Sequence, residues 1–291
     1  MTRLPFPLAW GERTYIMGIL NLTPDSFSGD GLLGQPDPVR AALEQARAFA
    51  AAGADLLDIG GESTRPGSAP VEANAELARV IPVIQAIAGE LDLVISIDTY
   101  KASVARAALA AGASWINDVW GLRADPQMAA LAAETGAPLI LMHNRSRPAD
   151  AELQVRLGGR YVGVHYDNLL ADVSRELLES ADLAKAAGVH PDHIILDPGI
   201  GFGKTVAQNL ELVDRLGEIR SLGYPVLLGT SRKGFIGYTL DLPVEERLEG
   251  TAATVAVGIA RGADIIRVHD VTPMVRVARM ADALVRRGKV R

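Results

Sequence analysis

One stretch of the chain shows most clearly how the fold is built: Ile194-Ile195-Leu196-Asp197-Pro198-Gly199-Ile200-Gly201-Phe202-Gly203-Lys204-Thr205. Its short apolar run, too short for a helix, ends at the carboxylate of Asp197 and passes into a glycine-rich loop. A helical pattern around Leu210, Leu212 and Val213 follows. This order is typical of a strand, a functional loop and a returning helix.

The end of this stretch resembles two nucleotide-binding motifs, and it fits neither. A P-loop needs a glycine five residues before Gly203, but position 198 is proline, which lacks the main-chain amide that such a loop uses. A Rossmann fingerprint fails because Gly203 follows Gly199-x-Gly201 one residue early. We therefore expect Lys204 to lie at a loop-to-helix junction, and its replacement by alanine to be mild.

Size and composition set the first limits. A chain of 291 residues with 48% hydrophobic residues can form one α/β barrel or two smaller domains. The net charge of −6 disfavours a nucleic-acid surface but allows a local basic pocket for a small anion. The absence of cysteine excludes disulfides, thiolate metal sites and a cysteine nucleophile. No apolar run approaches the ~20 residues of a membrane helix and no signal-peptide core is visible, so a soluble, cytoplasmic protein is expected.

One sequence pattern recurs along the chain: an alanine-rich helical stretch ends at a glycine, two residues follow, and an apolar run begins. Glycine adopts the left-handed conformation of a helix end easily, so each instance indicates a helix that leads into a strand. The six glycines are Gly53, Gly112, Gly136, Gly188, Gly223 and Gly262. The predicted strands are Tyr15–Leu20, Leu56–Ile59, Leu93–Ile97, Trp115–Ile116, Leu139–Met142, Ile194–Leu196, Val226–Leu228 and Ile265–Val268. The predicted helices are Val39–Ala52, Ala75–Ala88, Ala102–Ala111, Pro126–Thr135, Tyr166–Ala187, Ala207–Arg220, Val244–Arg261 and Pro273–Arg287.

Eight apolar strands that alternate with helices predict a parallel sheet buried on both faces, closed as a single-domain (β/α)₈ TIM barrel over residues 15–291. An open doubly wound sheet is the structural alternative. Residues 1–14 are expected to form a small N-terminal hairpin across the bottom of the barrel. No break in composition marks a second domain.

Polar residues gather where the predicted strands end, on the face that carries the chemistry of such barrels. A single one of them could simply cap a helix, but the whole set points to a site. The set comprises Asn21, Asp58, Asp98, Asn117, Asp118, His143, Asp197, Thr230, Ser231 and His269, with Lys233 and Arg267 close by. Two long glycine-rich loops, Thr23–Gly34 and Gly60–Ala73, are candidate lids. The long segment Asn144–Gly163 gives no chemical indication.

The ring of polar residues suits a ligand with two different ends. Carboxylates such as Asp98 and Asp197 favour a planar ligand with several N–H donors, and Asn117 can both donate and accept. Positive charge for a phosphate or pyrophosphate comes from Lys233, Arg267 and His269. The mouth of the barrel is therefore expected to bind a heterocycle on one side and an anion on the other.

These residues lie in motifs that resemble the dihydropteroate synthases of folate biosynthesis, a pterin-binding barrel family. The motifs run in order from the first strand to the last. They are Asn21-Leu22-Thr23-Pro24-Asp25-Ser26-Phe27-Ser28, Asp58-Ile59-Gly60-Gly61-Glu62-Ser63-Thr64-Arg65-Pro66-Gly67, Ser96-Ile97-Asp98-Thr99, Ile116-Asn117-Asp118, Asp197 to Lys204, Gly229-Thr230-Ser231-Arg232-Lys233 and Arg267-Val268-His269.

The resemblance implies a transferase that joins 6-hydroxymethyl-7,8-dihydropterin diphosphate to 4-aminobenzoate, with release of pyrophosphate. By the same carry-over, the enzyme is a homodimer, uses Mg²⁺ and is a target of sulfonamides. Asp98, Asn117, Asp197 and Lys233 would hold the pterin, while Asn21, Arg267 and His269 would handle the pyrophosphate, with Asn21 near the metal ion. The aminobenzoate site would be shaped by Phe27, Thr64, Arg65, Pro66, Phe202 and Lys233. Val268 belongs to the last motif and is included among the substrate-binding residues, and Lys233 and Arg267 among the catalytic ones.

Two places depart from the family pattern. In the first loop many relatives have an acid directly after the serine, whereas here Ser28 is followed by Gly29, and we assign the role of the loop acid to Asp30. After His143 the usual short loop is replaced by a longer segment, whose role is open. A pterin-binding methyltransferase domain and a catalytically silent pterin-binding protein are the alternatives, and the presence of Asn21, Thr64 and Arg65 favours the synthase.

Overall fold

The computed structural model describes residues 6–23, 31–63, 68–162 and 164–286. Within them, eight strands form one sheet in the order β8-β5-β4-β3-β2-β1-β10-β9, and every neighbouring pair is parallel. A parallel bridge between Leu196 and Val226 joins the two edges, so the sheet closes. The strands are β1 (Tyr15–Asn21), β2 (Leu56–Gly60), β3 (Val94–Asp98), β4 (Trp115–Asp118), β5 (Leu139–Met142), β8 (Ile194–Asp197), β9 (Leu227–Leu228) and β10 (Ile265–Val268).

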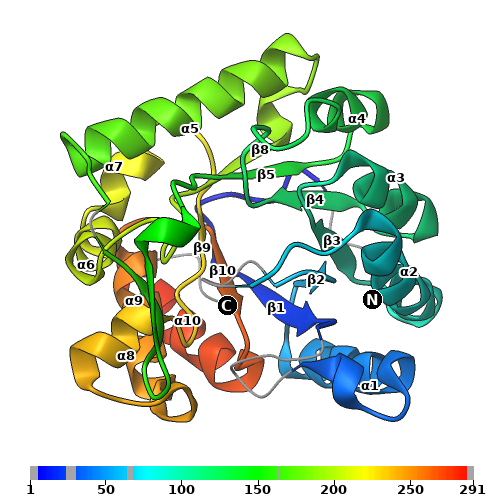
Figure 1. The fold of residues 1–291 in the computed structure, drawn as a ribbon, viewed down its shortest axis with the longest axis horizontal. Coiled ribbons are helices and arrows are strands. Elements are labelled where there is room, and N and C mark those ends of the chain that lie inside the picture. Colours follow the sequence, from blue (N-terminus) through cyan, green and yellow to red (C-terminus); the bar gives the residue numbers. More distant parts are fainter. Residues whose placement is uncertain (1–5, 24–30, 64–67, 163, 287–291) are drawn as a thin grey trace.

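Helices surround this sheet, as Figure 1 shows. They are α1 (Pro38–Ala52), α2 (Ala73–Glu90), α3 (Ala102–Ala111), α4 (Met128–Thr135), α5 (Leu169–Ala186), α6 (Val206–Asp214), α7 (Leu216–Arg220), α8 (Gly234–Leu240), α9 (Leu248–Ala260) and α10 (Val271–Val285). The six glycines expected to end helices all have positive φ, from 66° to 121°. The predicted (β/α)₈ barrel is thus confirmed, and none of the described helices has the length and hydropathy that a membrane span requires.

Two predicted helices differ from those observed, and two features were not predicted: the helix α8 and a hairpin after β5. The helix expected over Ala207–Arg220 is divided into α6 and α7 at Arg215, whose φ of −101° and ψ of 21° leave the helical region. The helix expected from Val244 begins only at Leu248, after a short 3₁₀ turn. The segment after β5 contains an antiparallel hairpin, β6 (Ala151–Gln154) and β7 (Gly158–Tyr161), which the sequence did not indicate.

The alternation of side chains along the strands places the site. On each strand, one set of residues packs against the helices and the other points into the barrel. The inward set begins with an apolar layer and continues with polar residues: Leu56 precedes Asp58 on β2, and Ile195 precedes Asp197 on β8. The lower part of the barrel is therefore a packed core, and the polar layer above it forms the floor of a site at the carboxyl ends of the strands.

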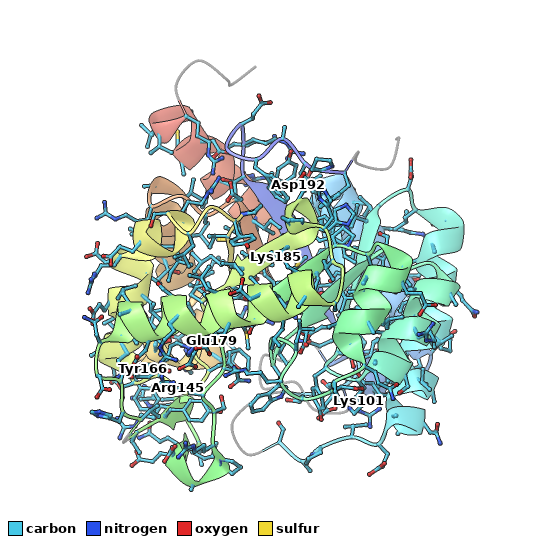
Figure 2. The ribbon with its side chains drawn as sticks, turned by 90° about the horizontal axis from the view of Figure 1, so that it is seen from above. Lys101, Arg145, Tyr166, Glu179, Lys185 and Asp192 are labelled. Atoms are coloured by element: carbon cyan, nitrogen blue, oxygen red, sulfur yellow. The ribbon has the colours of Figure 1, made fainter. Side chains whose placement is uncertain are left out.

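The amino-terminal segment closes the other end. Residues 6–14 form turns and contain no strand, so the predicted hairpin is wrong for the part that is described. Leu8 is buried in the apolar layer inside the barrel, where Phe6 and Trp10 also pack. Figure 2 shows Asp192 at this end, and Lys101, Arg145 and Tyr166 at the opposite end, where the loops that follow the strands lie.

Candidate active site

A cavity of about 610 Å³ opens at the carboxyl ends of the strands. Seven of the residues selected from the sequence line it: Asn21, Asp98, Phe202, Ser231, Lys233, Arg267 and His269. Its volume falls in the range of sites for small molecules of drug size. Of the other selected residues, Phe27, Asp30, Thr64, Arg65 and Pro66 lie outside the described part of the chain.

Asp58 is the centre of the floor. Its Oδ2 accepts a 2.6 Å hydrogen bond from Arg267 Nε and a 2.9 Å bond from Asn117 Nδ2, and its side chain is fully buried. Arg267 Nη2 also donates to Asp98 Oδ2 at 2.8 Å. The partly exposed guanidinium of Arg267 thus joins the inward residues of β2, β3 and β4 into one network.

The charges of this network influence one another. Burial, and then the charge of Asp58, raise the pKa of Asp98 to about 8, although Arg267 opposes the shift. Burial disfavours the charge of Arg267, but Asp58 and Asp98 outweigh it and raise its pKa. Asp98 is therefore harder to ionise than an ordinary carboxyl group, and Arg267 is the partner that favours its charged form.

Two polar atoms of the floor have no partner among the described residues. Asp58 Oδ1 and Asn117 Oδ1 are both buried and make no hydrogen bond there. Leaving a buried acceptor without a donor costs about 1–3 kcal/mol, so such atoms mark places where a ligand or water supplies the missing donor. Both atoms can accept a hydrogen bond from a water molecule or from a ligand N–H group that reaches the floor.

Asp197 stands on the opposite side of the floor, at the end of β8. It is 6% exposed, and its Oδ1 accepts a 2.7 Å hydrogen bond from the amide of Gly199. Burial raises the pKa of Asp197, while the nearby ammonium of Lys233 and the Gly199 amide oppose the rise. Neither Asn117 nor Asp197 belongs to the cavity lining, and both are nearly buried just beyond it.

Lys233 projects from the loop after β9 across the glycine-rich loop. Its Nζ donates to the carbonyl of Ile200 and lies 4.7 Å from the centre of the Phe202 ring. Burial lowers the pKa of Lys233 to about 8, against the attraction of Asp197. Lys233 thus lies between the acidic floor and the Phe202 ring, and both residues line the cavity.

The last strand supplies both an inward and an outward residue. Arg267 points into the barrel, whereas the side chain of Val268 is buried among the helices. Val268 can therefore reach a substrate only through its main chain. His269 follows, with its Nδ1 2.9 Å from Ser231 Oγ, and Ser231 Oγ also accepts from the His269 amide at 3.1 Å. If the hydroxyl donates to Nδ1, the ring proton is on Nε2.

The donor set near Asn21 bears on a metal ion. Within the described ranges, no three histidine, aspartate or glutamate side chains gather as a complete metal site. Asn21 offers a single amide oxygen at the cavity wall. This fits Mg²⁺, which is held by one or two protein oxygens together with water and the phosphates of a substrate, better than metals that need a full protein cage.

The sequence missed one wall of the cavity. The hairpin β6–β7 lines it with Leu153, Val155 and Tyr161 among others, and lies beside α8 in Figure 1. The hairpin is fixed to α8 by a hydrogen bond from Tyr238 Oη to the carbonyl of Gly158, and Arg247 donates to the carbonyl of Leu157. Asp58 was noted as a strand-end residue, but its central position was not foreseen.

Other strand-end residues have structural roles. Asp118 accepts from the amides of Trp120 and Leu122 with its two oxygens, so it shapes the turn after β4. His143 is buried and bonded to Lys204. Lys204 lies at the predicted loop-to-helix junction, directly before Thr205, the N-cap of α6, but its side chain is buried at 1% exposure.

Comparison with known proteins agrees with this geometry. The family model described as pterin binding enzyme matches residues 17–269. The dihydropteroate synthase of Bacillus subtilis is 51% identical over 286 residues, which cover 98% of this chain and 94% of that protein. The crystal structure of the Clostridium difficile dihydropteroate synthase in the presence of pteroic acid is similar, with a TM-score of 0.86 and 46% identity over 96% of this chain and all of that one. The Xanthomonas albilineans dihydropteroate synthase with 4-aminobenzoic acid is also similar, with a TM-score of 0.83 and 42% identity over 94% of each chain. The chain therefore belongs to the pterin-binding enzyme family and, within it, to the dihydropteroate synthases.

Proposed function

We propose that this chain condenses 6-hydroxymethyl-7,8-dihydropterin diphosphate with 4-aminobenzoate to give 7,8-dihydropteroate and pyrophosphate. The observation that carries the proposal is a single cavity with an acidic floor, formed by Asp98 with Asp58 beneath it, and a basic wall, formed by Lys233 and His269. Relatives with pteroic acid and with 4-aminobenzoic acid share the fold and nearly half of the sequence.

The floor would recognise the pterin. The Asp197 carboxylate is placed to accept N–H groups of the heterocycle, and Asn117 Oδ1 lacks a donor that the pterin can supply. Asp98 lines the cavity beside them, where its carboxyl group can accept an N–H group of the ring or, when it carries a proton, donate to a ring nitrogen. Arg267 keeps both acids of β2 and β3 in place.

The basic wall would hold the diphosphate. His269 and Lys233 line the cavity on the side where the strand ends meet positive helix amino termini. Asn21 would hold a Mg²⁺ ion together with diphosphate oxygens, and the bound ion would supply positive charge to the departing pyrophosphate. Arg267 is already paired with two carboxylates, so its part in handling the diphosphate requires that pterin binding loosen one of these bonds.

The amine needs position more than a base. The nitrogen of an aniline is uncharged at neutral pH and already has its lone pair, so holding it against the pterin methylene supplies most of what the reaction requires. Phe202 and Lys233 offer a flat surface and a cation for the ring and carboxylate of 4-aminobenzoate. We assign the remaining contacts to Phe27, Thr64, Arg65 and Pro66, and the role of loop acid to Asp30, on sequence grounds.

A homodimer, a cytoplasmic location and inhibition by sulfonamides are also proposed on the strength of the resemblance. Light scattering during gel filtration measures the first. A sulfonamide that competes with 4-aminobenzoate in the assay below would support the last.

The function is tested by following pyrophosphate release from the pterin diphosphate with Mg²⁺, in the presence and absence of 4-aminobenzoate. The proposal expects release that depends on the arylamine. Release at the same rate without 4-aminobenzoate would indicate a hydrolase, and no release under either condition would favour a silent pterin-binding protein.

A further inference from the structure

The Gly-Lys-Thr sequence that resembles a P-loop contains a lysine that is turned into the protein. Lys204 Nζ faces three acceptors: His143 Nδ1 at 2.9 Å, the carbonyl oxygen of Gly199 at 2.9 Å and the carbonyl oxygen of Phe202 at 3.0 Å. An ammonium group has three N–H donors and no acceptor, so each donor finds one partner. Because the ammonium group is buried and all its donors have partners within the protein, Lys204 has a structural role.

The groups behind His143 complete the charge balance. Burial lowers the pKa of His143 to about 3, so its ring is neutral, and its Nε2 lies 3.0 Å from Glu176 Oε2. Burial opposes ionisation of Glu176, but His143 and Arg145 hold its pKa below the ordinary range. An accepting Nδ1 and a protonated Nε2 therefore place the imidazole between the Lys204 ammonium and the Glu176 carboxylate. Burial holds the pKa of Lys204 well below its ordinary value, against the attraction of Asp197 and then Glu176. The three acceptors around Nζ are the contacts that favour its charged form.

The loop that Lys204 holds is tightly constrained. Gly199 has a φ of 70°, and a Cβ there would lie 1.8 Å from the carbonyl oxygen of His143. Gly203 has a φ of 60°, and a Cβ there would lie 2.3 Å from the carbonyl carbon of Arg145. Tyr166 Oη donates to the carbonyl of Gly203 at 2.9 Å, and Figure 2 shows Tyr166 next to Arg145.

Phe202 supplies the aromatic ring with which this loop lines the cavity, and Gly201 and Lys204 line it as well. Its amide donates to the carbonyl of Gly199 at 3.1 Å, and Lys204 binds the carbonyls of both residues. Lys204 thus spans the turn that aims the Phe202 ring at Lys233. Without the ammonium, two buried carbonyls lose a donor, which favours a different path of the turn.

We propose that Lys204 is a positioning residue for the arylamine: it fixes the turn from Gly199 to Phe202, and through it the Phe202 ring on which 4-aminobenzoate binds. This inference rests on the proposed function and extends it to a residue that touches neither reacting group. All three donors of the ammonium group are used within the protein, which leaves none for a phosphate in this structure.

Steady-state kinetics of Lys204→Met tests the proposal, because methionine keeps an unbranched apolar side chain but has no donor. The KM for 4-aminobenzoate should rise about tenfold or more, while the Kd for the pterin diphosphate changes less than about threefold. Lys185→Met, which removes an exposed lysine on α5 that contacts Asp182 and Tyr224, is the matched control and should match the wild type. An unchanged KM for 4-aminobenzoate would overturn the proposal, as would equal losses for both substrates.

Chemical rescue separates a positioning role from a general need for the fold. The chain has no cysteine, so Lys204→Cys carries a single thiol, which can be alkylated in denaturant before refolding. Bromoethylamine restores an ammonium at nearly the length of lysine, whereas bromopropane gives the uncharged chain of the same length. The aminoethyl protein should regain the low KM and the propyl protein should not. Equal KM values for the two would overturn the proposal.

A readout that needs no turnover keeps this test apart from that of the function. In Lys204→Met, amide hydrogen exchange at Gly199 and Phe202 should accelerate relative to the strands, in the absence of any substrate. Wild-type pyrophosphate release decides the function, and the exchange rates and KM ratios decide the role of Lys204. Unaltered exchange in the loop of the variant would contradict the proposed anchoring.

Discussion

Replacement of Asp197 by asparagine isolates the contribution of one charge on the floor to pterin binding. The introduced side-chain amide keeps an oxygen that can accept the 2.7 Å hydrogen bond from Gly199, so the glycine-rich loop should stay in place. What is lost is the charge-assisted bond that the carboxylate makes to N–H groups of the ligand. A bond of this kind at a site only 6% exposed is worth about 2–4 kcal/mol, which corresponds to a roughly 30- to 700-fold weaker Kd.

The assay is calorimetric titration of a pterin diphosphate into both proteins at pH 8, where the carboxylate is more fully ionised than at neutral pH. Because burial raises the pKa of Asp197, the neutral asparagine should not reduce the free energy of unfolding, and a urea titration checks this. Asp92→Asn, at an exposed position, is the matched control. Equal affinities of Asp197→Asn and the wild type would show that the pterin is recognised elsewhere.

Three further outcomes are expected. Arg247→Met removes a guanidinium that is 1% exposed and donates to the carbonyl groups of Leu242, Arg232 and Leu157. The free energy of unfolding in urea should therefore fall by roughly 3 kcal/mol. Arg156→Met, at the exposed pair with Asp241, is the control and should change it little. The pKa of His143 is lowered to about 3, so as the pH falls the unfolded chain takes up a proton at this histidine before the folded protein does. The free energy of unfolding should therefore fall between pH 6.5 and pH 3, and His143→Gln should reduce the slope of this loss by up to about 1.4 kcal/mol per pH unit. Equal slopes in the two proteins would contradict a buried neutral ring. Arg65→Ala should raise the KM for 4-aminobenzoate far more than the Kd for the pterin diphosphate, since the long loop that carries it is expected to close only after the diphosphate is bound, and similar losses for both would refute that order.

The barrel could be predicted because its signals are local. Apolar runs, helical periodicity and a glycine at each helix end are read within a few residues, and the six glycines adopt the expected left-handed conformation. The polar floor was also within reach, since side chains alternate along a strand and Asp98, Asn117 and Asp197 stand at strand ends. Position along a strand therefore predicted which residues share the mouth of the barrel.

The pairing of charges could not be read in the same way. Arg267 was expected to face an anion, but it is bonded to Asp58, which is 209 residues away in sequence. Its choice of partner depends on how the closed sheet brings β10 beside β1 and then β2, which no local pattern specifies. The contact between Lys204 and His143 also joins residues far apart in sequence, so the motif around Lys204 predicted only a loop and not the burial of its side chain.

The hairpin β6–β7 was not predicted, and the reason is different. Its strands are only four residues long, and β6 is mostly exposed, with Leu153 at 68% exposure, so no hydrophobic alternation marks it. It is held instead by contacts with distant elements, such as the bond from Tyr238 to Gly158. The division of the helix at Arg215 likewise follows from tertiary packing, since Leu216 and Ile219 of α7 are fully buried.

The most direct measurement of the central claim follows the atoms of the new bond. The pterin diphosphate, labelled with ¹³C at its exocyclic methylene, is incubated with ¹⁵N-labelled 4-aminobenzoate, Mg²⁺ and the protein, and the products are observed by NMR while pyrophosphate is quantified. The account predicts a one-bond coupling between the two labels in dihydropteroate, with one pyrophosphate released for each coupled product. Pyrophosphate without the coupled product, or a labelled methylene that appears as the free alcohol, would contradict it.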